Sequence, residues 1–319
     1  LQDEIEAMRQ AGTLKGAEEV TCEVIPAAGE RGPRYRIEGE GDKTFIKMNA
    51  NSYLGLSLHP EIVAAEEGAA RAFGVGPGAV RFISGTHTPH IALEERLAAF
   101  HGRQAGMIFS SAYATTLGVL VPLVDAETAV VSDALNHNCI INAMRLARPA
   151  AKGIYRHLDL EHLDELLAGL AGSCSRVIVV TDGIFSMRGD HAPLDEIRAI
   201  VDRHDENFPQ NIVLLVDDSH GVGAFGETGR GTEEVTGGHS DLLIATLGKA
   251  LGVNGGYVVG SQTLIDYLRE TAALYIYSNP ITVGEAAAAL RSLEILSGTE
   301  GRELLDHLRA MTSAFEQGL

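Results

Sequence analysis

The sequence predicts an α/β protein in which about seven mostly parallel strands are flanked by helices. Three observations support this fold class. Short runs rich in Val and Ile recur from residue 105 to residue 260, amphipathic helical segments separate most of them, and 45% of the 319 residues are hydrophobic. Parallel strands need crossover connections and are usually covered on both faces. A chain of this size and composition can bury a large core.

Three elements are expected before this alternation begins. Residues 2–12 have the charged, amphipathic pattern of a helix, and residues 34–50 ("RYRIEGE", "GDK", "TFIKMNA") predict a short hairpin. A helix with several alanines is expected from His59 onward. We expect residues 1–50 to form an N-terminal segment of helix and hairpin.

The strands follow one another at intervals that leave room for a helix between most of them, as βα units require. The pattern becomes helical from residue 261 to the end. The predicted strands are "GMIFS" (106–110), "TAVVS" (128–132), "GIYRH" (153–157), "RVIVVTD" (176–182), "NIVLLVDDS" (211–219), "DLLIATLG" (241–248) and "GGYVVG" (255–260).

Composition limits the possible partners and compartments. The formal net charge of −18 argues against nucleic-acid binding, which depends on Lys and Arg, and against an anionic membrane surface. No apolar run reaches the roughly 18 residues that a membrane-spanning helix needs. Three widely spaced cysteines indicate free thiols in a reducing compartment. We therefore expect a cytoplasmic protein.

Polar residues follow five of the predicted strands. Ligands of open α/β sheets bind beyond the carboxyl ends of the strands, so these residues should face one crevice. They are Ser110 and Ser111; Asp133, Asn136 and His137; Asp182 and Ser186; Asp217, Asp218, Ser219 and His220; and Thr246 and Lys249.

One of these residues, Lys249, lies between two glycines in "TLGKALG", between two segments that predict buried strands. Most lysines in turns are exposed and have no chemical role. A lysine removed from water has a lowered pKa and can act as a nucleophile toward an aldehyde. The glycines and apolar surroundings favour the second interpretation.

The segment "VDDSHGVG" after the strand "IVLLV" allows three interpretations. Asp217 and His220 could cap a loop, or they could bind a metal for which Asp133 and His137 are further ligands. A metal-dependent hydrolase would use Asp217, Asp218, His220 and His137. Alternatively, Asp217 could join Lys249 in binding pyridoxal 5′-phosphate (PLP), which needs a lysine for its aldehyde and a carboxylate for its pyridinium nitrogen. The metal interpretation gives Lys249 no role, so we favour PLP and expect no metal.

The same edge of the sheet offers the other contacts that PLP needs. His220 could bond the phenolic oxygen, and His137 could stack on the ring. The helix that begins after "MIFSS" could bind the phosphate through Ser111 and the backbone amides of Ala112 and Tyr113. Each signal is weak alone, but their order along successive strand ends is a strong indication.

Six blocks of the sequence resemble those of the α-oxoamine synthases, fold-type I PLP enzymes that condense an amino acid with an acyl-CoA. The resemblance extends from about residue 2 to residue 319, and within the family it is closest to the glycine C-acetyltransferase branch. The blocks are "NSYLGLSLHP" (51–60), "VRFISGT" (80–86), "SDALNH" (132–137), "TDGIFSMRGD" (181–190), "VDDSHGVGAFGETGRG" (216–231) and "TLGKALG" (246–252).

The resemblance implies catalytic roles for four residues. Lys249 would hold the cofactor aldehyde and then act as the general base. Asp217 and His220 would hold the ring nitrogen and the phenolic oxygen, and His137 would stack on the ring.

Further contacts are implied in the same way. Ser186 and Thr246 would lie close to the cofactor, and Asn51 would contact the substrate carboxylate. The family is homodimeric with the site at the interface, so Ser278 would reach the cofactor of the partner.

The resemblance also implies a reaction, in which glycine or another small amino acid combines with an acyl-CoA to give a β-keto amino acid or an aminoketone. Glycine C-acetyltransferase is the expected activity. However, "ALGVNGGY" after the lysine is more similar to the 5-aminolevulinate and 8-amino-7-oxononanoate synthase branches, which are alternatives, and His87 and "NC" at 138–139 also depart from the acetyltransferase pattern. A non-catalytic partner subunit is the alternative of another class, and the presence of Lys249 counts against it.

The resemblance further predicts two domains after the N-terminal segment. Residues 51–280 would form the large PLP-binding domain and residues 281–319 the start of a C-terminal small domain. We expect the chain to lack most of that small domain, which supplies an arginine for the substrate carboxylate in the family. Arginines such as Arg31, Arg34, Arg36 or Arg81 are expected near the entrance for CoA.

Overall fold

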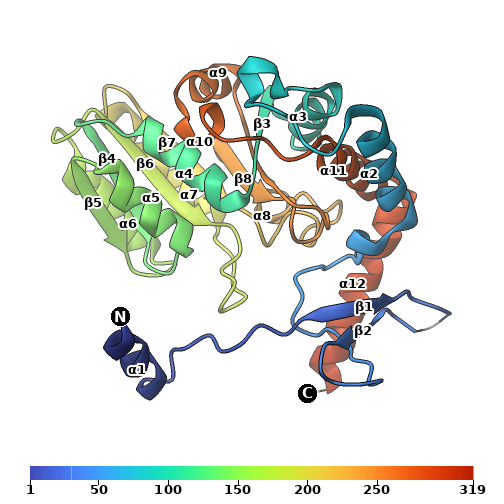
Figure 1. Ribbon diagram of the computed structural model, residues 1–319. Coiled ribbons are helices and arrows are strands. Elements are labelled where there is room, and N and C mark those ends of the chain that lie inside the picture. Colours follow the sequence, from blue (N-terminus) through green and yellow to red (C-terminus); the bar gives the residue numbers. More distant parts are fainter. Residues whose placement is uncertain (30, 319) are drawn as a thin grey trace. The chain divides into compact units, whose positions relative to one another are not determined.

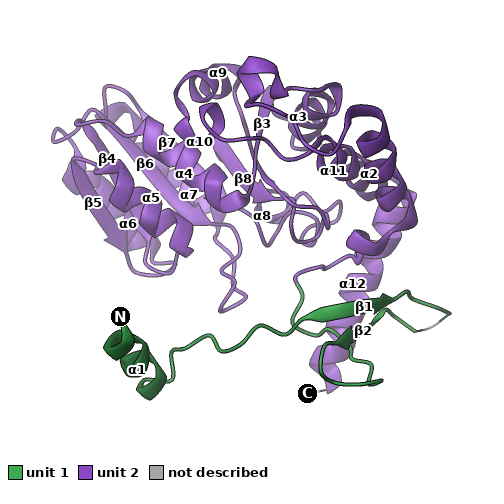
Figure 2. Ribbon diagram, viewed as in Figure 1, with its two compact units in different colours: residues 1–50 green, residues 51–319 purple. Residues whose placement is uncertain are grey.

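The computed structural model describes residues 1–29 and 31–318. The chain forms two compact units, residues 1–50 (unit 1) and residues 51–319 (unit 2), which Figure 2 shows in different colours. The division expected between residues 51–280 and 281–319 stays a prediction.

Unit 1 contains one helix and a two-stranded antiparallel sheet. The helix, α1 (Gln2–Gln10), confirms the prediction for residues 2–12 and ends before Gly12, which has a φ of +67°. The sheet pairs β1 (Thr21–Ile25) with β2 (Arg34–Ile37).

The hairpin predicted for residues 34–50 is wrong. Its first arm is β2, but the partner of β2 is β1, and the second arm contributes one bridge between Phe45 and Tyr35. β1 is rich in β-branched residues, which favour strands. In the second arm Ile46 and Met48 are exposed, so burial of apolar side chains does not stabilise a strand there.

Unit 2 is built on a seven-stranded sheet with the order β3-β9-β8-β7-β6-β4-β5 (Figure 1). In this sheet β9 runs opposite to the other six strands, so the prediction of about seven mostly parallel strands is confirmed. The strands are β3 (Ala105–Phe109), β4 (Thr128–Asp133), β5 (Ala151–Tyr155), β6 (Arg176–Asp182), β7 (Ile212–Asp217), β8 (Leu242–Thr246) and β9 (Gly256–Gly260).

Helices cover both faces of this sheet. Successive residues of a strand point to opposite faces: in β6, Val177 and Val179 belong to one buried cluster, and Ile178 and Val180 belong to the other. The first cluster includes residues of α2 (Pro60–Phe73), α3 (Thr88–Phe100), α6 (Leu160–Leu170), α7 (Leu194–His204), α11 (Val283–Leu296) and α12 (Thr299–Gly318). The second includes residues of α4 (Ala112–Leu123), α5 (Asn138–Ala147), α9 (Gln262–Thr271) and α10 (Ala273–Ile276).

Shorter elements complete unit 2. They are α8 (Thr232–Thr236), the single turns Leu56–Leu58 and Asp205–Asn207, and the π-helical turn Arg81–Gly85. In the described part of the chain, no helix combines the length and apolar character needed to cross a bilayer.

Arg81, expected near a CoA entrance, instead lies in the interior. Its side chain is buried and forms a bidentate ion pair with Glu94, at 3.0 and 3.1 Å. Arg269 also donates to Glu94, at 2.9 Å, and Arg81 lies 5.4 Å from the centre of the Tyr275 ring. A guanidinium committed to a buried carboxylate cannot bind phosphates at the surface, so the expectation for Arg81 was wrong.

Candidate active site

A cavity of about 200 Å³ lies at the carboxyl ends of β4, β6, β7 and β8. Parallel strands end at the same edge of a sheet, and this edge is where ligands of α/β proteins bind. The cavity is lined by Ala112, Tyr113, His137, Cys139, Asp182, Ile184, Ser186, Asp217, Ser219, His220, Thr246 and Lys249. A cavity is therefore present at the predicted edge of the sheet. The predicted strand-end residues that line it are His137, Asp182, Ser186, Asp217, Ser219, His220, Thr246 and Lys249.

Lys249 reaches the cavity from the tight connection between β8 and β9. Hydrogen bonds from Leu247 N to Gly255 O and from Val253 N to Leu247 O, both 2.9 Å, hold this connection. At Gly252, with φ +71°, an added Cβ would lie 2.4 Å from Ser57 N, so only glycine fits there. Burial lowers the pKa of the Lys249 ammonium, although Asp217 and Asp182 oppose this shift.

Asp217 ends β7 and presents its carboxylate to the cavity. Its Oδ1 accepts hydrogen bonds from Ser219 Oγ at 2.6 Å and from Ser219 N at 3.2 Å. Its Oδ2 accepts from Thr116 Oγ1 at 3.2 Å and lies 3.7 Å from Cys139 Sγ. These partners fix the orientation of a carboxylate that is buried at the floor of the cavity.

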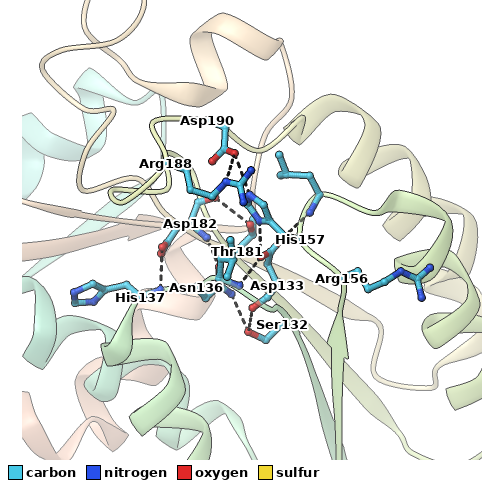
Figure 3. A network of polar contacts seen from close by, with 12 residues as sticks. Ser132, Asp133, Asn136, His137, Arg156, His157, Thr181, Asp182, Arg188 and Asp190 are labelled. Atoms are coloured by element: carbon cyan, nitrogen blue, oxygen red, sulfur yellow. Dashed lines mark hydrogen bonds and ion pairs between the residues drawn. The ribbon is translucent and has the colours of Figure 1, made fainter. Parts of the chain in front are cut away.

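His137 begins α5 and is fixed at its backbone by Asp182. The His137 amide donates to Asp182 Oδ2 at 2.9 Å (Figure 3). The His137 ring lies with Nδ1 2.9 Å from Cys139 Sγ and makes an edge contact with the Tyr113 ring. Burial and the neighbouring Asp217 raise the pKa of Asp182 to about 8.

His220 lies three residues after Asp217, the last residue of β7, and its side chain also lines the cavity. Burial and the positive charge of Lys249 lower the pKa of His220 to about 4, so its ring is neutral at neutral pH. Its Nδ1 lies 2.7 Å from the hydroxyl of Tyr53. The sequence did not indicate a role for Tyr53, because Tyr53 is 167 residues from His220 in the sequence and does not follow a predicted strand.

A polar network holds the loop that brings Ile184 and Ser186 to the cavity. His157 lies between two carboxylates, with Nδ1 2.9 Å from Asp133 and Nε2 3.2 Å from Asp190 (Figure 3). Asp190 lies in the loop that follows β6, and its carbonyl accepts a hydrogen bond from the Phe185 amide at 2.9 Å. Residues 184 and 191 of this loop form a bridge. Asp133 therefore positions a loop and does not line the cavity.

Three other strand-end residues are also not among the lining residues of the cavity. Asn136 is buried, donates to Ser132 and Val180, and accepts from the Asp182 amide. Asp218 accepts from the amide and hydroxyl of Thr232, at 2.6 and 2.8 Å, and burial raises its pKa to about 7. Ser110 is not among the lining residues.

The start of α4 lies at the cavity wall. Ser111 is the N-cap of α4 and accepts from the Ala114 amide at 3.1 Å; it does not line the cavity, whereas Ala112 and Tyr113 do. Gly256 of β9 passes so close that an added Cβ would lie 2.4 Å from Ala112 N. The exposed amides of a helix N-terminus bind anions.

Asn51 and Ser278 lie outside the set of lining residues. Asn51 is exposed, and its Oδ1 is 3.4 Å from the Tyr53 hydroxyl. Ser278 is half-buried and follows α10. No group of three or more His, Cys, Asp or Glu side chains within residues 1–29 and 31–318 has the arrangement of a metal site.

Comparison with known proteins identifies the family. Residues 43–319 match the family described as aminotransferase class I and II. The chain is 39% identical over 324 residues to 8-amino-7-oxononanoate synthase of Exiguobacterium sibiricum, and the matched region covers 100% of this chain and 77% of that protein. It is 37% identical over 318 residues to human mitochondrial 2-amino-3-ketobutyrate coenzyme A ligase, covering 99% and 72%. The chain belongs to the α-oxoamine synthases.

A solved structure agrees with this assignment. The serine palmitoyltransferase of S. paucimobilis, with a bound compound of PLP and myriocin, has a TM-score of 0.82 and 28% identity over 95% of this chain and 75% of that chain. The predicted fold-type I architecture is confirmed, and the cofactor of this α-oxoamine synthase is PLP.

The residues of this α-oxoamine synthase fit that cofactor. A lysine with a lowered pKa, a buried carboxylate and a neutral histidine converge on one cavity. The glycine at position 256 leaves the first amides of α4 open where a larger residue would fill the space. An aldehyde, a pyridine nitrogen, a phenolic oxygen and a phosphate each have a chemically matched group at this edge of the sheet.

Proposed function

We propose that the protein joins an amino acid to an acyl-CoA thioester with the specificity of an 8-amino-7-oxononanoate synthase. The single observation that supports the chemistry is the convergence of Lys249, Asp217 and His220 on one cavity. The relatives of that name, at up to 39% identity, support the specificity better than the glycine C-acetyltransferase activity expected from the sequence.

Each group would hold one part of PLP. Lys249 would bind the aldehyde, Asp217 would keep the ring nitrogen protonated, and His220 would donate to the phenolic oxygen. His137 would cover the ring face. The amides of Ala112 and Tyr113, with Ser111, would bind the phosphate, while Ser186 and Thr246 would lie against the cofactor.

When bound, PLP acidifies the α-hydrogen of an amino acid by withdrawing electrons from the α-carbon. Lys249 would act as the general base at that carbon, because its lowered pKa leaves more of it unprotonated near neutral pH. Asn51 would hold the substrate carboxylate, and His137 would steer the acyl carbonyl. The new bond forms between the α-carbon and the acyl carbon, the C–S bond breaks, and CoA leaves as a thiol.

The product named in the relatives defines the substrates. In 8-amino-7-oxononanoate, the methyl group and the amino carbon derive from alanine, whose carboxyl group leaves as CO₂. The remaining seven carbons derive from a pimeloyl thioester. A second candidate is supported by the 37% identity to 2-amino-3-ketobutyrate coenzyme A ligase, whose product combines glycine with an acetyl group and keeps the carboxylate.

A substrate panel tests the proposal. The purified protein, saturated with PLP, is given alanine or glycine with pimeloyl-CoA or acetyl-CoA, and free thiol and CO₂ are measured. We expect the alanine and pimeloyl-CoA pair to give both products at the highest kcat/KM. Thiol release only from glycine and acetyl-CoA would establish the second candidate, whether or not CO₂ is detected, because a β-keto acid also loses CO₂ without an enzyme. If no pair releases thiol while PLP is bound, the non-catalytic alternative is favoured.

The cofactor lysine is tested separately. Borohydride reduction of the PLP-bound protein, followed by peptide mapping, should place the label on Lys249. Lys249→Ala should abolish turnover, and Lys152→Ala, a matched change at an exposed lysine of β5, should leave it unchanged. Normal turnover by Lys249→Ala without an added amine would overturn the assignment.

We also propose a homodimer in which Ser278 reaches the phosphate of the partner's cofactor. Support comes from exposed apolar side chains close to Ser278 in the fold: Tyr277 is 80% exposed, and Phe82 and Ile83 in the turn beside α10 are 63% and 67% exposed. Sedimentation equilibrium should give twice the chain mass, and Phe82→Asp should shift it toward the monomer.

A further inference from the structure

The hydroxyl of Tyr53 contacts the ring of His220, which lines the cavity. The oxygen lies 2.7 Å from His220 Nδ1, which is a short hydrogen bond. The two rings are tilted by 46° with centroids 6.3 Å apart, so they are not stacked. The contact between them is therefore made through this hydrogen bond.

The direction of the hydrogen bond follows from the groups around it. The His220 ring is neutral at neutral pH, so it carries one N–H and one acceptor nitrogen. Burial raises the pKa of Tyr53, so its hydroxyl keeps its single proton. That proton can go to Nδ1 at 2.7 Å, or it can go to Asn51 Oδ1 at 3.4 Å while a protonated Nδ1 donates to the Tyr53 oxygen. The Asn51 contact is longer than an ordinary O–H···O hydrogen bond, so donation to Nδ1 is the favoured arrangement.

The other ring nitrogen of His220 is left for the ligand. No hydrogen bond joins Nε2 to any group in the part of the chain that the structure describes, and His220 lines the cavity. A phenolic oxygen that has lost its proton can only accept hydrogen bonds. It therefore requires Nε2 in its protonated form.

We propose that Tyr53 is a positioning residue that holds His220 as the Nε2–H tautomer, so that His220 donates to the phenolic oxygen of bound PLP. This inference rests on the role of His220 in the proposed function. Tyr53 is not among the residues that line the cavity with Lys249, and its effect passes through the imidazole. The hydrogen bond of the second ring nitrogen decides which nitrogen of a histidine carries the proton.

The tautomer is measured directly in the protein without cofactor. Long-range ¹H–¹⁵N correlation spectra of ¹⁵N-histidine-labelled protein, with His220 assigned by loss of its signals in His220→Asn, report which nitrogen is protonated. We expect a protonated Nε2 and an acceptor Nδ1, and Tyr53→Phe should shift the Nδ1 resonance. A protonated Nδ1 in the unsubstituted protein would overturn the proposal.

A double-mutant cycle on PLP binding tests the link to the cofactor. Tyr53→Phe should raise the Kd for PLP by roughly two- to tenfold, the range of one net hydrogen bond, and should shift the visible absorption band of the bound cofactor. Tyr267→Phe is the matched control, since its hydroxyl donates to Pro122 O on α4, away from the cavity. It should leave both readouts unchanged.

The cycle separates action through His220 from direct action. If Tyr53 acts through the imidazole, Tyr53→Phe has little further effect in a His220→Asn background. Additive effects on Kd would overturn the proposal. Because PLP binding is the readout, the result does not depend on which amino acid or acyl-CoA is turned over. A failed substrate panel is thus distinguishable from a failed tautomer assignment.

Discussion

Asp182 and Asp217 lie side by side in register at the ends of the neighbouring parallel strands β6 and β7. Both are buried, and both line the cavity. Two carboxylates this close cannot both ionise without strong repulsion. Burial first and Asp217 second raise the pKa of Asp182 to about 8, so Asp182 is largely protonated at neutral pH in the protein without cofactor.

This pair makes the stability of the cofactor-free protein depend on pH. Between about pH 4 and about pH 8, the folded protein holds a proton on Asp182 that the unfolded chain has lost. The contribution of Asp182 to the free energy of unfolding should therefore fall as the pH rises through this window, by at most about 1.4 kcal/mol per pH unit. His101 and His220, whose pKa values are lowered to about 3 and about 4, contribute the opposite slope below about pH 6.5. Urea titrations from about pH 6.5 to about pH 8 measure this slope, because the histidines are neutral in both states there.

Substitution of Asp182 isolates its part of the slope. Asp182→Asn keeps an oxygen that can accept from the His137 amide, and it removes the titration. We expect a shallower decline than in the unsubstituted protein, with the part due to Asp218 remaining. Asp266→Asn, at an exposed carboxylate of α9, should not change the slope. An equal slope in Asp182→Asn would contradict the assignment.

A second prediction concerns Glu94, the carboxylate shared by Arg81 and Arg269. Glu94 also accepts from the Ile108 amide at 3.0 Å, so it ties α3 to β3. Glu94→Gln would leave two guanidinium groups without a buried counter-charge. We expect the free energy of unfolding to fall by about 3–5 kcal/mol. The matched change at the exposed neighbour, Glu95→Gln, should cost less than about 0.5 kcal/mol, and equal losses would mean that the pairing is unimportant.

A third prediction concerns the contact between β9 and α4. An added Cβ at Gly256 would lie 2.4 and 2.5 Å from the N and Cα of Ala112, which are backbone atoms and cannot rotate away. Gly256→Ala should displace the first turn of α4, raise the Kd for PLP, and destabilise the fold by roughly 1–3 kcal/mol. Calorimetric titration with PLP measures the first effect. Gly169→Ala, where an added Cβ meets nothing within 4 Å, should leave the Kd unchanged.

The parts of the site that lie at strand ends could be predicted from the sequence, because the end of an apolar run is visible in it. Lys249, Asp217 and His137 were found in this way and line the cavity. The direction of a side chain was harder to predict. Asp217 and Asp218 are consecutive, and only the fold decides that the first faces the cavity while the second binds Thr232.

Contacts between distant segments could not be predicted from periodicity at all. Tyr53 precedes the first helix of unit 2, and nothing in its local pattern indicates a contact with His220. The buried cluster around Glu94 has the same character, since Arg81 and Arg269 come from a short turn and a late helix. Charged residues are usually found at the surface. Their burial here depends on the ion pairs with Glu94, which is 13 residues from Arg81 and 175 residues from Arg269 in the sequence.

The last prediction concerns the thiols. Cys139 lies at the floor of the cavity and is buried, and burial together with Asp217 raises its pKa to about 12. Cys22 in unit 1 is exposed. Because the thiolate is the reactive form, iodoacetamide at pH 8 should label Cys22 at least about 100-fold faster than Cys139. Peptide mapping by mass spectrometry measures both rates.

Two controls complete the labelling experiment. In urea both cysteines should react at similar rates, because burial is the main cause of the difference. Cys22→Ser should remove the label at position 22 and leave the slow labelling of Cys139 unchanged. Fast labelling of Cys139 in the native protein would mean that the cavity floor is open and that its thiol is ionised. Cys139 would then be a nucleophile beside His137, and the inert position that we assign to it would be wrong.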